Sequence, residues 1–252
     1  MQLTDTLTTD ARQYIVELFQ RELSEDHRFH DLAHTLSVKE TALILGREMG
    51  LSDEKLELLE LAGLFHDSGF TKTYIGHEQE SQKIAQAFLQ ERGYLADKTE
   101  QVLALIAATR PEYIPQNELE KVIRDADMGH LGREHYLLAT ENLRYEWKVF
   151  LDKEYEDLDW LRTNFTFLKQ HEYQTEAAKK LFDEQLNKNK KAIKKMRKKE
   201  RKIKQKAVKG TTISGSSTAR MAFKTALRNH IDLTAIADNK ANIMLSINAI
   251  II

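Results

Sequence analysis

Apolar residues recur every three or four positions along most of residues 1–185. In residues 9–23, for example, they occupy positions 11, 14, 15, 18, 19 and 23, which share one face of an α-helix. No segment alternates between apolar and polar residues as a half-buried strand does. The pattern therefore predicts an all-α domain, a helical bundle, over residues 1–185. Its helices are expected over residues 9–23, 32–49, 52–66, 78–90, 98–109, 117–128 and 134–150.

The pattern changes after residue 185. Residues 172–206 lack Gly and Pro, and residues 186–209 are predicted to form a basic helix with few apolar positions. Residues 210–218 contain mostly Gly, Ser and Thr and are expected to form a flexible linker. Residues 219–252 end in a mostly apolar run over 243–252, shorter than the about 20 residues that cross a bilayer. This end is either a buried terminal helix or the truncated start of a membrane segment, and we favour the second.

Basic residues are concentrated in one part of the chain. Residues 188–209 contain 13 Lys and Arg against one acidic residue, although the whole chain has a net charge of −1. Such a segment can bind nucleic acid, bind anionic lipid or form a solvated helix. It has no aromatic residue on which bases could stack, so we favour anionic membrane lipid over nucleic acid. The chain also has no Cys, which excludes disulfides and thiolate zinc sites.

Three short motifs carry side chains that bind metal ions. His66 and Asp67 adjoin each other at the end of an apolar helical run, with His34 upstream and Asp127 downstream. Two imidazoles and two carboxylates form a mixed nitrogen and oxygen set that suits divalent ions of borderline hardness. Carried on three helices, these side chains could converge in the core of a bundle. The set leaves Mn, Mg, Fe, Co, Ni and Zn open.

The order and spacing of His34, His66-Asp67 and Asp127 resemble the HD superfamily of metal-dependent phosphohydrolases, over residues 25–150. The resemblance implies an α-helical fold and hydrolysis of a phosphate ester, commonly of a nucleotide. It also implies that these four residues are metal ligands, with Asp67 orienting the attacking water. In the Asp-Ala-Asp motif we place the ligand at the second aspartate and expect Asp125 to support it.

Other residues near these motifs are candidates for catalysis and substrate binding. His77 is a candidate for proton transfer, and a structural role is equally supported. Lys72 is a candidate catalytic and phosphate-binding cation, and Arg110 and Arg133 are candidate phosphate contacts. A solvated surface role is at least as well supported for these three cations. Some binuclear members of the superfamily place a further histidine where this chain has Thr109 and Arg110, so one metal ion is favoured over two.

Three further histidines are interpreted more simply. His30 shares a helical face with His34 and is expected to be a surface or supporting group. His130 and His135 are interpreted as structural or exposed. For the four predicted ligands themselves, the alternative is that they are unrelated core or capping residues.

The C-terminal residues carry a second resemblance. Residues 227–252 resemble the opening of the Pycsar effector transmembrane domain, which belongs to bacterial anti-phage membrane proteins. The distinctive part is Ala-Asp-Asn-Lys-Ala-Asn at residues 237–242. The resemblance implies an HD domain joined to a membrane effector, cytoplasmic and tethered to the inner membrane.

Three functions are compatible with these features. The primary hypothesis is a metal-dependent phosphohydrolase or phosphodiesterase that acts on a nucleotide, with cyclic nucleotides among the candidates. The alternative is a non-catalytic nucleotide sensor domain of an anti-phage membrane effector. A third and weaker hypothesis is a protein that binds nucleic acid through residues 188–209. The substrate and the oligomeric state stay open.

Overall fold

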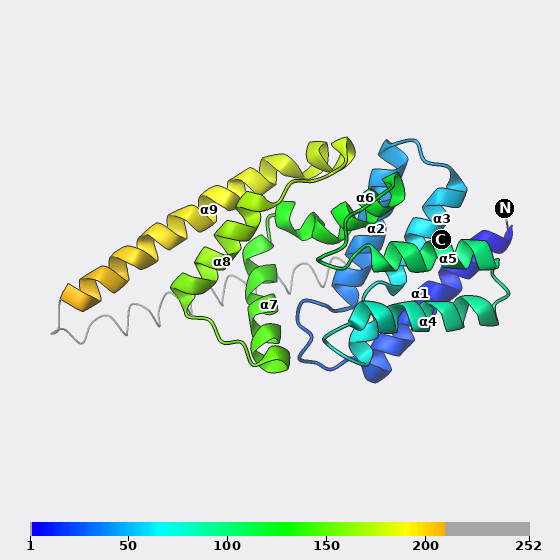
Figure 1. The fold of residues 1–252 in the computed structure, drawn as a ribbon, viewed down its shortest axis with the longest axis horizontal. Helices are drawn as coiled ribbons and strands as arrows, with labels where there is room; N and C mark the ends of the chain where they lie inside the picture. Colours follow the sequence, from blue (N-terminus) through cyan, green and yellow to red (C-terminus); the bar gives the residue numbers. More distant parts are fainter. Residues whose placement is uncertain (1, 210–252) are drawn as a thin grey trace, which may run out of the picture. The chain divides into compact units, whose positions relative to one another are not determined.

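In a computed structural model that describes residues 2–209, with the side chains of residues 6–205, the chain folds into α-helices and two short 3-10 helices (Figure 1). These described residues contain no strand, so the all-α prediction is confirmed for them. The predicted linker and membrane segment, residues 210–252, lie outside the described residues. The elements are α1 (Gln2–Glu22), α2 (Leu32–Glu48), α3 (Asp53–Phe65), η1 (Ser68–Thr71), α4 (His77–Glu91), α5 (Ala96–Ala107), α6 (Glu118–Asp127), η2 (Met128–Gly132), α7 (Tyr136–Leu151), α8 (Asp157–Gln170) and α9 (Glu176–Lys209).

The predicted helices are all present, with ends that differ by a few residues. The apolar pattern did not single out α8, because its buried face is not purely apolar. Asn164 lies in that face and accepts hydrogen bonds from the hydroxyl groups of Tyr136 (2.8 Å) and Thr140 (2.6 Å). A polar residue that is satisfied by specific partners can replace an apolar one in a core, and this interrupts the apolar periodicity.

Helix α3 is the centre of the bundle. It packs against α1, α2, α5 and α6, and Leu59, Leu61, Leu64 and Phe65 on it have no exposed surface. A helix that is apolar on all sides is expected in a core rather than at a surface. His66 directly follows the last residue of this helix, so the segment after α3 begins inside the core.

A glycine allows α2 and α3 to approach closely. A Cβ atom at Gly63 would lie only 2.8 Å from Cα and 3.2 Å from the backbone nitrogen of Lys39 on α2. Gly63 precedes His66 by three residues, and Lys39 follows His34 by five. The close contact of the two backbones therefore lies one to two turns from both predicted histidine ligands.

The chain divides into two units, Met1–Ile193 and Lys194–Ile252. The domain limits predicted from the sequence, at residues 185, 209 and 218, stay predictions. Within residues 2–209, no helix combines the length and the apolar character needed to cross a membrane.

We predict that Gly63→Ala lowers the free energy of unfolding by about 1–3 kcal/mol, the range for overpacking a core. The added methyl group would press on backbone atoms of Lys39, which cannot rotate away. Chemical denaturation followed by circular dichroism measures this loss. Gly46→Ala is the matched control, because its added Cβ meets only the ends of flexible leucine side chains, Leu56 at 2.6 Å and Leu51 and Leu59 at 3.3 Å. An equal or smaller loss for Gly63→Ala than for Gly46→Ala would contradict the prediction.

Candidate metal centre

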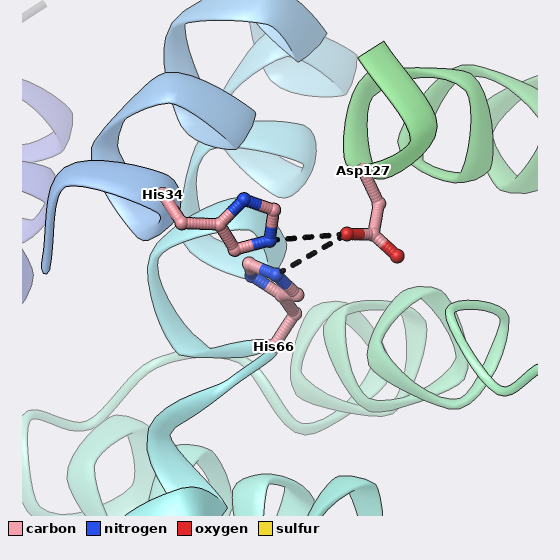
Figure 2. A group of neighbouring side chains, drawn as sticks. All are labelled: His34, His66 and Asp127. Carbon is pink, nitrogen blue, oxygen red and sulfur yellow. Dashed lines mark ion pairs between the residues drawn. The ribbon is translucent and has the colours of Figure 1, made fainter. Parts of the chain in front are cut away.

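Three side chains that are distant in the sequence meet at the ends of three helices (Figure 2). His34 lies in the first turn of α2, His66 follows the last residue of α3, and Asp127 ends α6. Oδ1 of Asp127 lies 3.3 Å from Nε2 of His34 and 3.8 Å from Nε2 of His66. One ligand atom from each residue lies within 4.8 Å of the other two, so a single metal ion could bind all three.

Asp67 adds a second carboxylate to this group. Its Oδ2 lies 3.1 Å from Nε2 of His66 and 3.5 Å from Nε2 of His34. Adjacent residues on a helix point in different directions, but α3 has ended here and the backbone turns into η1. Both residues of the pair therefore face the same place. We call His34, His66, Asp67 and Asp127 the four-residue cluster.

The cluster contains buried polar atoms without hydrogen-bond partners. Among the described residues these include Nε2 of His34, Nε2 of His66 and Oδ2 of Asp67. Buried polar atoms in proteins are nearly always hydrogen-bonded, so three atoms that make no hydrogen bond, with both nitrogens at ion-pair distance from the oxygen, require an explanation. A divalent cation bound between them would satisfy all three, and the mixed nitrogen and oxygen ligands suit such an ion. The residues present thus fit a metal ion.

A backbone contact orients the ring of His66 for this role. Its Nδ1 lies 2.8 Å from the carbonyl oxygen of Gly63, which can only accept a hydrogen bond. Nδ1 therefore carries a proton, and Nε2 of the neutral ring keeps its lone pair directed at the cluster. Metal-binding histidines are commonly held in this way. The same glycine thus brings α2 close to α3 and holds the imidazole.

The electrostatics of the cluster favour positive charge. Burial lowers the pKa of His66, but the carboxylates of Asp67 and Asp127 outweigh burial and raise this pKa to about 9. Burial raises the pKa of the Asp67 carboxyl, but the imidazoles of His66 and His77 outweigh it and hold this pKa well below its usual range. The net effect is to keep both carboxylates charged. In the metal-free protein a proton on His66 compensates part of this negative charge.

His77 also lies at the cluster. It is the first residue of α4, and its Nε2 lies 3.5 Å from Oδ1 of Asp67, the oxygen that does not face the other imidazoles. Its ring stacks on Phe70 with the ring centroids 3.7 Å apart, and its Nδ1 lies 3.2 Å from the carbonyl oxygen of Tyr74. Burial lowers the pKa of His77, but its contact with Asp67 outweighs burial and raises this pKa.

The crossing of η1 over α4 depends on a second glycine. Gly69 donates its backbone N–H to the hydroxyl of Ser81 at 2.8 Å. A Cβ atom at Gly69 would lie 1.9 Å from the carbonyl oxygen of His77, so no larger residue fits there without movement of the backbone. This close approach holds the start of α4 beside Asp67.

The structure pairs two of the predicted phosphate-binding cations with other groups. Nζ of Lys72 lies 2.5 Å from a carboxylate oxygen of Glu22, and its side chain is half exposed. Arg110 donates a hydrogen bond of 3.0 Å to the side chain of Gln82 on α4. Their roles in catalysis and substrate binding stay predictions, and each would have to exchange its present partner for substrate.

Arg133 lies on the other side of the cluster, after η2. It donates a hydrogen bond of 2.8 Å to the hydroxyl of Thr41 on α2, and its guanidinium carbon lies 5.6 Å from the ring centroid of Phe182 on α9. Burial lowers the pKa of this guanidinium. Its predicted contact with phosphate also stays a prediction.

The structure adds a buried carboxylate that sequence reasoning missed. Glu146 on α7 has no exposed surface, and its Oε2 lies 2.6 Å from Nδ1 of His30 and accepts a hydrogen bond of 3.1 Å from the hydroxyl of Tyr74. Its Oε1 accepts hydrogen bonds from the backbone N–H groups of Phe29 (2.6 Å) and His30 (3.0 Å). Burial raises the pKa of Glu146, but the hydrogen bonds from His30 and the backbone outweigh it and lower this pKa.

Glu146 brings His30 to the edge of the cluster. The His30 ring stacks on Phe70 at 4.2 Å, and its centroid lies 6.0 Å from that of His34 and 6.2 Å from that of His77. The sequence indicated only that His30 shares a helical face with His34. No pattern in the sequence connects His30 with a glutamate 116 positions away.

Asp125 and His130 lie close to Asp127 in the sequence. Asp125 was expected to support the ligand Asp127, and this stays a prediction; its carboxylate accepts hydrogen bonds from the backbone N–H of Gln174 and Thr175. It therefore binds the segment just before α9. His130 lies beside the cluster, with its Nδ1 3.1 Å from the carbonyl oxygen of Asp127, and burial lowers its pKa to about 4.

The comparisons with known proteins agree with this geometry. The family model described as HD domain matches residues 31–130, which include the whole four-residue cluster. A crystal structure of a protein from Lactobacillus plantarum superposes with a TM-score of 0.57 at 15% sequence identity, covering 77% of this chain and 96% of that chain. This likeness concerns the fold alone. A search of the curated proteins gave no match.

The charge state of His66 predicts how stability depends on pH. Its pKa of about 9 in the folded protein exceeds the ordinary value of 6.5. The protonated ring therefore contributes stability that is complete below pH 6.5 and is lost as the pH rises through about 9. We expect the free energy of unfolding of chelator-treated protein to fall over this interval, as measured by denaturation with urea.

His66→Asn is the control, because it removes the titrating group. The fall in the free energy of unfolding between pH 6.5 and 9 should be smaller in this variant than in the wild type. Added Mn²⁺ should stabilise the wild type more at the upper end of the interval, since a metal ligand must be deprotonated. If the free energy of unfolding changed with pH in the same way in the two proteins, the stabilising role of the His66 proton would be contradicted.

Proposed function

We propose that the four-residue cluster binds a divalent metal ion and that the chain is a metal-dependent phosphohydrolase. The observation that carries this proposal is the set of unpaired buried atoms on His34, His66 and Asp67 that face one point. The match of residues 31–130 to the HD domain supports it independently, because the order of ligands is the one that the resemblance implies. A bound divalent ion lowers the pKa of water and polarises a phosphoryl oxygen.

Other side chains of this site would position the water molecule and transfer protons during hydrolysis. Oδ1 of Asp67 faces His77, so this carboxylate can hold a water molecule between itself and the substrate phosphorus. His77 can take up or return the proton of that water. His30, held through Nδ1 by Glu146, is in position to give a proton from Nε2 to the leaving oxygen. These side chains would supply general acid and base catalysis.

One metal ion fits this site better than two. A second ion would need further ligands, and some binuclear members of the superfamily place a histidine where this chain has Thr109 and Arg110, just after α5. Here Thr109 donates its hydroxyl hydrogen bond to the carbonyl oxygen of Ile106, and Arg110 donates a hydrogen bond to Gln82. Mn, Mg, Fe, Co, Ni and Zn all remain compatible with the ligand set.

We propose a nucleotide as the phosphate ester, with cyclic nucleotides among the candidates. The resemblance of the C-terminal residues to an anti-phage membrane effector supports a nucleotide signal and a site tethered to the inner membrane. The alternative is a sensor that binds such a nucleotide without hydrolysing it. Turnover by metal-loaded protein distinguishes an enzyme from a sensor.

We predict that Asp67→Asn lowers kcat by about 100-fold or more, the usual contribution of a general base or of an oriented water. The neutral amide keeps the shape of the side chain but removes the charge that faces His77. Release of phosphate or of nucleotide product, over a panel of linear and cyclic nucleotides with Mn²⁺, measures the loss.

Asp159→Asn is the matched control for this test. Asp159 lies on α8 with a half-exposed side chain paired to Arg162, so the same chemical change there should leave turnover unchanged. Tight binding of a nucleotide by the wild type without any turnover would favour the sensor. Full activity of Asp67→Asn on the substrate of the wild type would contradict the mechanism.

We also propose that the basic part of α9 contacts anionic lipid. Residues 188–209 carry 13 basic residues and one acidic residue, and Lys194, Lys195 and Lys198 are exposed. Each basic residue near an anionic bilayer adds about 1 kcal/mol of attraction. The full chain should therefore sediment with phosphatidylserine vesicles and not with phosphatidylcholine vesicles, and salt should release it.

The triple variant Lys194→Glu, Lys195→Glu and Lys198→Glu should lose this binding. A triple variant with the same change of charge, Lys55→Glu, Lys83→Glu and Lys148→Glu, is the control, because these lysines lie on other helices, α3, α4 and α7. Equal losses in the two variants would indicate a dependence on net charge and would contradict a specific contact through α9. Preference for RNA over the vesicles would favour the nucleic-acid alternative.

A further inference from the structure

The segment that follows Asp127 is held by α9. Asn189 on α9 is buried and donates hydrogen bonds of 2.9 Å from its side-chain amide to the backbone carbonyl groups of Leu131 and Arg133. The hydroxyl of Tyr173, just before α9, donates a hydrogen bond of 3.2 Å to the carbonyl oxygen of Met128. Carbonyl groups at the end of a short helix lack partners within it, and here side chains from α9 and its approach supply them.

Close packing adds to these hydrogen bonds. Phe182 on α9 is 3% exposed and lies against two glycines of η2. A Cβ atom at Gly132 would lie 2.5 Å from Cβ and 2.9 Å from the carbonyl oxygen of Phe182, and one at Gly129 would lie 3.2 Å from its ring. At Gly132 the backbone of η2 therefore rests on the backbone of α9, and at Gly129 it rests on the ring of Phe182.

A third contact is made by a residue that precedes Asp127 in the sequence. Asp125, two residues earlier, accepts hydrogen bonds from the backbone N–H of Thr175 (2.8 Å) and of Gln174 (2.9 Å), and from the hydroxyl of Thr175 (2.8 Å). Asp127 thus lies between two points that are bound to residues 173–193, the side chain of Asp125 before it and the backbone of η2 after it. Its own carboxylate contacts His34 and His66 across the cluster.

We propose that α9 positions Asp127, so that docking of α9 and occupancy of the metal site stabilise each other. If α9 moved away from η2, the backbone carbonyl groups after Asp127 and the carboxylate of Asp125 before it would lose their partners, and the Asp127 carboxylate would leave the position that completes the cluster. Coupling between two sites is reciprocal, so a bound metal ion must in turn strengthen the docking of α9. The positioning residues are Asn189, Phe182 and Asp125.

This inference rests on the proposed metal site but goes beyond it. Helix α9 lies outside residues 31–130, which match the HD domain, and it continues into the basic segment to Lys209. A partner that pulls on or releases α9 would therefore change the affinity of the site for its metal ion. In the opposite direction, events at the metal site would be transmitted along α9 to the C-terminal part of the chain.

The test is a titration of the chelator-treated full chain with Mn²⁺ by isothermal calorimetry, in the wild type and in Asn189→Ala. Removing the amide leaves the carbonyl groups of Leu131 and Arg133 without their partner, and we expect Kd for Mn²⁺ to rise about 10-fold, within the usual range of coupling. Asn187→Ala is the matched control, because Asn187 is exposed on the same helix. Its Kd should equal that of the wild type.

Hydrogen exchange of the wild type gives the reciprocal measurement without any substitution. Addition of Mn²⁺ should slow exchange of the amides in residues 176–193 by a similar factor. If Asn189→Ala does not fold, as judged by circular dichroism, Tyr173→Phe removes a single hydroxyl from the same contact and replaces it in the titration, with a smaller rise in Kd expected.

Equal Mn²⁺ affinities in the wild type and the folded variant, with exchange in α9 unchanged by the metal, would overturn the coupling alone. A wild type that binds no divalent ion would overturn the proposed metal site together with the coupling. The two failures are therefore distinguishable by the titration of the wild type.

Discussion

The structure depends on the burial of two carboxylates beside two imidazoles in the interior of a helical bundle. Burial of uncompensated negative charge is costly, so this arrangement requires a positive charge at its centre. In the metal-free protein, a proton on His66 meets part of that requirement, which is why its pKa rises to about 9. The unpaired atoms on His34 and Asp67 leave a divalent cation as the better partner. Both the fold and the proposed chemistry follow from this constraint.

The residues of the cluster lie at or next to the ends of helices rather than along their sides. His66 follows the end of α3 inside the core, and close contacts at Gly63 and Gly69 bring α2 and α4 to it. The end of α6 supplies Asp127 from the opposite side, and α9 binds the backbone around this residue. His34, His66 and Asp127 thus lie at or next to helix ends, and Asp67 lies in the turn that follows α3.

Much of this could be predicted from the sequence, and the remainder has physical reasons. Helices with a regular apolar face were predictable, whereas α8 was not, because Asn164 interrupts its buried face. The convergence of His34, His66, Asp67 and Asp127 was predictable because their order resembles a family pattern. Glu146 was not, since a single buried glutamate carries no periodic pattern and meets His30 only in the folded chain. The partners of Asp125 were not predictable for the same reason, because they lie about 50 positions away.

The central claim is that one divalent ion binds among His34, His66, Asp67 and Asp127. The most direct measurement is anomalous diffraction at the absorption edge of manganese, from crystals of the chain grown with Mn²⁺. The account predicts one anomalous peak within coordination distance of Nε2 of both histidines and of an oxygen of each aspartate. A peak elsewhere, or two peaks of equal height in the cluster, would contradict it, as would the absence of any peak at these residues in protein saturated with the ion.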